Sequence, residues 1–88
     1  MREVARFLLQ ERPAQILLAA KRLKSPYIST LAKDVDCTYA HASRVVKKMG
    51  KLGLVKLNQR GRVKFVTLTP GGEKAAAALQ RIANLGEN

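Results

Sequence analysis

Basic side chains recur along one stretch of the chain at the spacing of a helix. Arg44, Lys47 and Lys51 lie three and four residues apart within 38–52, a stretch that contains no acidic residue. At about 100° of rotation per residue, these side chains share one face of a helix. Arginine and lysine bind phosphate oxygens, and an arginine guanidinium can also form paired hydrogen bonds with guanine. The chemistry that this stretch could perform is therefore binding of a nucleic acid.

The same stretch carries apolar residues on its other side. Four of them recur at the spacing i, i+3, i+4, i+7: Ala42, Val45, Val46 and Met49. This spacing places them together against a core. We therefore expect a helix over 38–52, capped by Thr38, with an exposed basic face centred on Ala40, Arg44, Lys47 and Lys51. A solvated helix face that binds nothing would show the same pattern.

The candidate contacts of this helix divide into two groups. Those expected at base edges, in the first turns, are Tyr39, Ala40, Ser43 and Arg44. Those expected at phosphates are His41, Lys47, Lys48 and Lys51. Tyr39 could instead cover the edge of the core, and His41 and Ser43 would also suit an ordinary polar surface.

A basic hairpin is predicted downstream of the helix. The stretches 54–57 and 63–68 have the composition of β-strands. Between them, 58–62 forms the expected tip, where Gly61 can adopt the positive φ of a tight turn. We expect Arg60 and Arg62 to project beyond the sheet and to contact the DNA backbone or minor groove. A disordered, solvated tip is the alternative.

Further helices must position these groups. Apolar spacing predicts an N-terminal helix within 1–12, a core helix over 14–24 that Pro13 starts at its first position, a short helix from about Thr30 and a C-terminal helix over 70–85. We expect Ser29 to cap the short helix, 34–37 to form a tight turn, and Thr69 to begin the last helix. Gly71 and Gly72 should weaken the start of that helix.

The length and charge of the chain restrict its class. Its 88 residues can form one hydrophobic core, so we expect a single domain over 1–88, with its central part at 13–69. A net charge of +11 favours polyanionic partners, above all nucleic acid. An anionic membrane would attract the same charge, but no apolar stretch approaches the roughly 18 residues of a membrane span. The charged beginning does not resemble a secretory signal, so we expect a cytoplasmic protein.

Metal and enzyme chemistry find little support. Cys37 and His41 are the only cysteine and histidine, too few for a zinc site built from such ligands. No arrangement of nucleophile and base is recognisable, so we expect neither a cofactor nor an enzyme. Cys37 precedes a helix, whose dipole could favour the thiolate and permit redox sensing; a thiol packed in the turn is the simpler interpretation.

The predicted order of helix, helix, basic helix, hairpin and helix resembles the winged helix-turn-helix domain of MarR-type and ArsR-type transcription regulators. The stretches that carry this resemblance are 28–35, 39–49, Leu52-Gly53-Leu54-Val55, Arg60-Gly61-Arg62 and 68–73. The resemblance implies a mainly α fold with a small β-hairpin wing, and binding to DNA. Nothing in the chain matches the metal-sensing sites of ArsR-type proteins.

Function follows as an expectation from the basic helix and the resemblance together. We expect sequence-specific binding of double-stranded DNA by a transcription regulator, a repressor rather than an activator, with helix 38–52 in the major groove and wing 58–62 beside it. One alternative is a weakly specific chromosomal DNA-binding protein. The other is a winged-helix module that binds RNA or protein in a replication or translation assembly. The sequence identifies no small-molecule effector.

A homodimer is also expected, because two recognition helices one DNA turn apart can bind a pseudo-palindrome. The candidate interface residues lie near the two ends of the chain: Val4, Phe7, Leu8, Leu79, Ile82 and Leu85. Packing of these residues within a single chain is the alternative.

Overall fold

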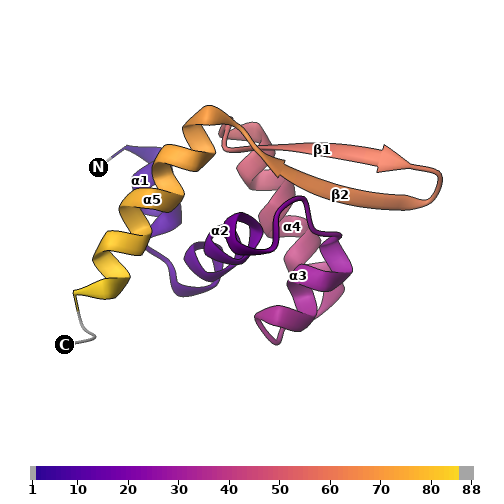
Figure 1. Cartoon of the computed structure of the whole chain (residues 1–88), viewed down its shortest axis with the longest axis horizontal. Helices are drawn as coiled ribbons and strands as arrows, with labels where there is room; N and C mark the ends of the chain where they lie inside the picture. Colours follow the sequence, from indigo (N-terminus) through magenta and orange to yellow (C-terminus); the bar gives the residue numbers. More distant parts are fainter. Residues whose placement is uncertain (1, 86–88) are drawn as a thin grey trace.

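Five helices and one two-stranded antiparallel sheet make up residues 2–85, the part of the chain that the computed structural model describes. In chain order they are α1 (Glu3–Leu8), α2 (Glu11–Leu23), α3 (Ile28–Asp34), α4 (Tyr39–Lys51), β1 (Val55–Arg60), β2 (Val63–Leu68) and α5 (Pro70–Asn84). Figure 1 shows the hairpin extending from one end of the molecule, with α1 and α5 at the other end. The expected mainly α fold with a β-hairpin is confirmed. None of these helices is long and apolar enough to cross a membrane.

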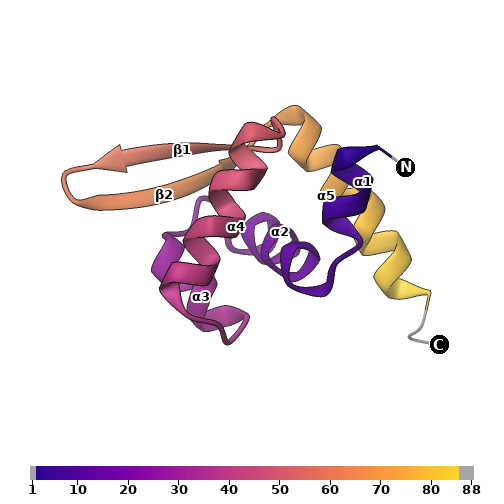
Figure 2. The ribbon, with the colours of Figure 1, turned by 180° about the vertical axis from the view of Figure 1, so that it is seen from behind.

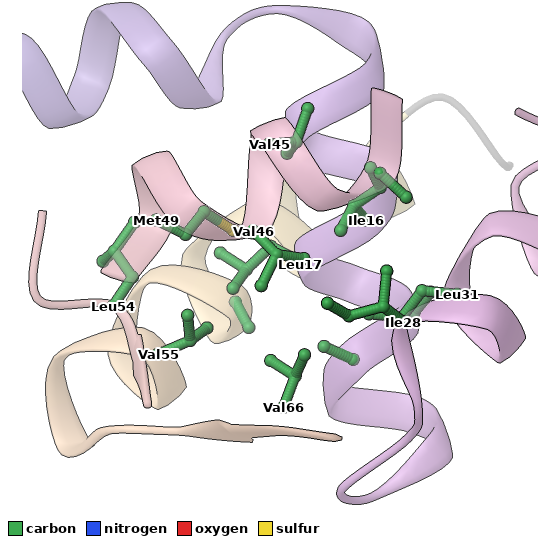
Figure 3. Close-up of a cluster of buried hydrophobic side chains, with 14 of the residues drawn as sticks. Ile16, Leu17, Ile28, Leu31, Val45, Val46, Met49, Leu54, Val55 and Val66 are labelled. Atoms are coloured by element: carbon green, nitrogen blue, oxygen red, sulfur yellow. The ribbon is translucent and has the colours of Figure 1, made fainter. Parts of the chain in front are cut away.

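The core lies where α2, α3 and α4 meet the base of the hairpin (Figure 3). Its largest fully buried side chains are Ile16, Leu17, Ile28, Leu31, Val46, Met49 and Val66. Burial of each such side chain contributes about 1.5–3 kcal/mol. The buried side of α4 consists of Ala42, Val45, Val46 and Met49, the four residues that the helical spacing predicts. The opposite side of α4 is therefore turned away from the core.

A turn over 35–38 joins α3 to α4 (Figure 2). Asp36 adopts a φ of 56°, and the Cys37 amide donates to the Ala32 carbonyl at 2.9 Å, a closure that is typical of helix C-termini. The Arg12 guanidinium of α2 donates to the Val35 carbonyl and holds the turn from the side. These contacts set the angle at which α4 leaves α3.

Two helix starts differ from the expectation. The predicted cap at Ser29 is wrong: α3 begins at Ile28, and Tyr27 precedes it without a side-chain cap. Ile28 is buried, and Tyr27 is held extended by a bridge to Phe65 in β2, so the helix starts as soon as the chain leaves that bridge. Likewise α2 begins at Glu11, with Pro13 in its first turn, where a missing amide hydrogen is tolerated.

Gly72 joins α5 to the beginning of the hairpin. A Cβ on Gly72 would lie 1.9 Å from the Leu54 carbonyl oxygen, so only glycine fits there. The Thr69 hydroxyl accepts from the Gly72 amide at 3.0 Å and donates to the Gly53 carbonyl at 2.6 Å. Thr69 thus begins the last helix, as expected. Gly72, expected only to weaken that helix, permits its close packing.

Candidate nucleic-acid interface

The basic face of α4 is open to solvent. Ala40, Arg44, Lys47 and Lys51 are all exposed, and no carboxylate within residues 2–85 forms an ion pair with Arg44, Lys47 or Lys51. The Thr38 hydroxyl accepts a hydrogen bond from the His41 amide at 3.1 Å, so the predicted cap of this helix is confirmed. The face therefore presents three unneutralised cations to an approaching polyanion.

Residues on the flanks of α4 have different surroundings. Tyr39 keeps 53% of its surface exposed. Ser43 and His41 are half-buried. Lys48 turns toward α1, where its Nζ lies 2.9 Å from the Glu3 carboxylate. Lys48 therefore already has an anionic partner within the chain, unlike the three cations of the basic face.

The hairpin differs from the expected tip. The strands pair as far as Arg60 opposite Val63, which leaves only Gly61 and Arg62 in the loop. Gly61 has a φ of 58° there, as a two-residue hairpin loop requires. The expectation that Arg60 projects beyond the sheet is wrong, because its guanidinium carbon lies 5.5 Å from the centroid of the Phe65 ring. Arg62 is exposed in the loop.

Two further cations stand on the strands of the hairpin. Lys56 in β1 and Lys64 in β2 are both exposed, and sequence reasoning did not single them out as site residues. A sequence signal was present for Lys56, which follows the buried Val55 and so points to the opposite face of the sheet; Lys64 shares its face with the buried Val66 and is exposed nearer the tip of the hairpin. With Arg60 and Arg62 they make the hairpin as basic as α4.

The fold of the chain is similar to the folds of several proteins with solved structures. No protein-family model matches the chain. AF1382 from Archaeoglobus fulgidus superposes with a TM-score of 0.84 at 26% identity, covering 98% of this chain and 99% of that one. The PcaV transcriptional regulator of Streptomyces coelicolor superposes at 0.80 with 22% identity, covering 89% of this chain and 58% of that one. FabT of Streptococcus pneumoniae, solved in complex with DNA, superposes at 0.77 with 13% identity, covering 84% of this chain and 54% of that one.

The chain has a winged-helix fold. In this fold the β1–β2 hairpin is the wing, and α4 is the second helix of the helix-turn-helix that it forms with α3. A curated relative, an uncharacterized protein of Archaeoglobus fulgidus, is 29% identical over 62 residues, which are 70% of this chain and 65% of that protein. The chain thus spans somewhat under two thirds of that relative's length and a little more than half of the lengths of PcaV and FabT.

The terminal helices of the winged helix leave an apolar groove, here called the terminal groove. It holds about 210 Å³ and is lined by Ala5, Leu8, Leu9, Ala75, Ala78, Leu79 and Ile82. Leu8 is only 6% exposed and belongs to the core of the single chain, so it is not free for a partner. Ile82 and Leu85 are largely exposed, as is Leu9, which sequence reasoning did not include.

The other expected interface residues pack within the chain. Val4, Phe7 and Leu79 are partly buried against the core. Packing within the single chain therefore accounts for these three residues and for Leu8. Leu9 and Ile82 at the edge of the terminal groove, and Leu85 beyond it, are exposed to solvent.

Cys37 is half-buried in the turn before α4, and its thiol donates to the Thr38 carbonyl at 3.5 Å. Within residues 2–85, no group of three or more His, Cys, Asp or Glu side chains is placed to hold a metal ion. Within the described residues, α4 and the wing are therefore the parts that carry the exposed, unpaired cations of the candidate interface.

Proposed function

We propose that this winged-helix chain binds double-stranded DNA in a sequence-specific way and regulates transcription. The observation that carries the proposal is the open basic face of α4, on which Arg44, Lys47 and Lys51 have no anionic partner within residues 2–85. The likeness in fold to the regulator PcaV and to FabT, which was solved with DNA, supports it.

Insertion of α4 into the major groove would use the face described above. A helix with its side chains is about 10–12 Å in diameter, which fits the major-groove width of about 12 Å, and the 13 residues of α4 make it about 20 Å long. Arg44, in the middle of the helix, is placed to form a bidentate pair with guanine, whereas Lys47 and Lys51 would bind phosphates. Tyr39, Ala40 and Ser43 are the remaining candidates for base edges, and His41 for a phosphate.

Repression follows most simply from this mode of binding, because a protein seated in the major groove of a promoter excludes other proteins from it. Such a regulator must share a compartment with its DNA, in line with the expected cytoplasmic location. It needs no bound cofactor and no catalysis to act in this way.

Two copies would bind together to an inverted repeat. The outer edge of the terminal groove, with Leu9, Ile82 and Leu85 exposed, supports association of a second copy at the end of the chain away from the wing (Figure 1). A pair of recognition helices one DNA turn apart then doubles the number of bases in contact.

A binding competition tests the proposal. Fluorescence anisotropy should show that the chain prefers duplex DNA to structured RNA at each of several salt concentrations, and selection from random duplexes should enrich one motif. The triple variant Arg44→Ala/Lys47→Ala/Lys51→Ala should lose most of this binding. The variant Lys74→Ala/Arg81→Ala, with two exposed cations removed from α5, serves as the control. Preference for RNA, or equal binding by both variants, would reject the proposal.

A further inference from the structure

Phe65 lies at the position of the wing where β2 has backbone partners on both sides. On one side its backbone pairs with Asn58 of β1, and on the other it forms a bridge with Tyr27. The adjacent Val66 amide donates to the Pro26 carbonyl at 2.9 Å. At Phe65, therefore, β2 has a neighbour on both sides, whereas the hairpin beyond it has only two strands.

The strand register places Arg60 beside this supported residue. Arg60 lies opposite Val63, and Val63 and Phe65 point to the same face of β2 because they are two residues apart. Arg60 is thus the diagonal neighbour of Phe65, a separation that long and aromatic side chains can bridge. Its guanidinium carbon is 5.5 Å from the ring centroid, within the range of a cation–π contact.

This contact leaves the guanidinium able to bind. A guanidinium stacked on a ring uses its flat face, while its N–H donors point outward from the edge. No carboxylate within residues 2–85 pairs with Arg60. A hollow of about 290 Å³, lined by Ser25, Tyr27, Arg60 and Phe65, lies open next to the group.

Arg62 has none of this support. It follows Gly61 in the two-residue loop, and within residues 2–85 it takes part in no side-chain hydrogen bond or ion pair. A free arginine loses more conformational freedom when it binds than one that is already ordered. The two arginines of the wing therefore enter a complex at different entropic cost.

We propose that Phe65 is a positioning residue of the wing, which orders Arg60 for a contact that discriminates between DNA sites, while Arg62 adds only site-independent charge. The proposal rests on the proposed DNA binding and deepens it. An ordered guanidinium is sensitive to the position and width of the groove it meets, whereas a mobile one follows the phosphates of any duplex.

Binding of a preferred duplex and a random duplex, each titrated at several salt concentrations, tests this division. Phe65→Leu keeps an apolar side chain but removes the ring, and should reduce preference for the chosen site about two- to fivefold. Arg60→Ala should reduce it at least as much, and the double variant Arg60→Ala/Phe65→Leu no further. Phe65→Tyr, which keeps the ring, should bind as the unaltered chain does. Arg62→Ala should weaken both duplexes equally and flatten the salt dependence.

Thermal unfolding of each variant distinguishes a loss of positioning from a loss of stability. If the ring serves mainly to hold Arg60, Phe65→Leu and Phe65→Tyr should unfold at similar temperatures. Normal site preference in Phe65→Leu, tighter binding by that variant, or additive losses in the double variant would overturn the inference and leave DNA binding intact. Absence of duplex binding by the unaltered chain would instead overturn the proposed function, and the inference with it.

Discussion

Lys48 forms its ion pair with Glu3, while Lys47, one position earlier, extends into solvent. A rotation of about 100° per residue is enough to separate them, because it turns one side chain toward α1 and the other toward the open face. Two neighbouring lysines of α4 therefore have different surroundings, one paired with a carboxylate and one in solvent.

Replacement of the two lysines should show this difference. Lys47→Ala should weaken preferred and random duplexes alike and lower the salt slope by about one unit. Lys48→Ala should have a smaller effect, because Lys48 must first leave Glu3. In a Glu3→Gln background the effect of Lys48→Ala should grow, which duplex titrations at several salt concentrations would measure. Equal effects of Lys47→Ala and Lys48→Ala in both backgrounds would contradict this reasoning.

Arg44 should behave differently from both lysines. Its replacement by alanine removes the one side chain on the basic face that can form paired hydrogen bonds with guanine, so Arg44→Ala should cost about 1–3 kcal/mol on the preferred site. On random duplex the loss should be smaller. Competition between the two duplexes measures the ratio, and an unchanged ratio would show that Arg44 contacts only phosphate.

At the scale of the elements, the start of α5 depends on the close packing of Gly72 against the Leu54 carbonyl. Gly72 is buried against the Leu54 carbonyl at the beginning of the wing, whereas Gly71, its neighbour, has its nearest atoms 3.6 Å from an added Cβ. The same helical turn therefore contains one glycine that the packing requires and one that it does not.

Alanine substitutions at these two glycines form a matched pair. Gly72→Ala should lower the free energy of unfolding by about 1–3 kcal/mol, because the wing and α5 must move apart to admit the methyl group. Gly71→Ala should be neutral or stabilising by up to about 1 kcal/mol, since alanine favours the helix. Urea denaturation followed by circular dichroism measures both. Similar values for the two variants would show that α5 does not approach Leu54 so closely.

At the scale of the whole molecule, the wing and the terminal groove lie at different ends. The wing extends from one end, and α1 and α5 form the other, where the terminal groove lies (Figures 1 and 2). A second copy could therefore occupy the terminal groove without covering the wing.

Ile82 provides the test of this arrangement. It is 57% exposed at the edge of the groove, so Ile82→Asp should leave the core intact but place a charge in the proposed dimer contact. Sedimentation at micromolar concentration should show a dimer for the unaltered chain and for Arg81→Ala, and a monomer for Ile82→Asp. DNA selection with the Ile82→Asp variant should enrich a single half-site. A monomer in every sample would reject the dimer.

Local patterns in the sequence were sufficient to predict α4 and its two faces. The cap at Thr38, the buried side at Ala42, Val45, Val46 and Met49, and the open side at Arg44 all follow from the rotation of a helix about its own axis. The hairpin and the start of α5 at Thr69 were likewise readable, because turn glycines and helix caps act on residues close by in the chain.

Contacts between residues far apart in the sequence were decided by the tertiary structure alone. Glu3 reaches Lys48 across 45 positions, Tyr27 meets Phe65 across 38, and Gly72 touches Leu54 across 18. No periodicity of the intervening residues predicts these contacts, because they depend on how separate helices and strands pack on a shared core. Helical rotation placed the cations of α4 on its surface, and the packing of the domain determined which of them remained unpaired.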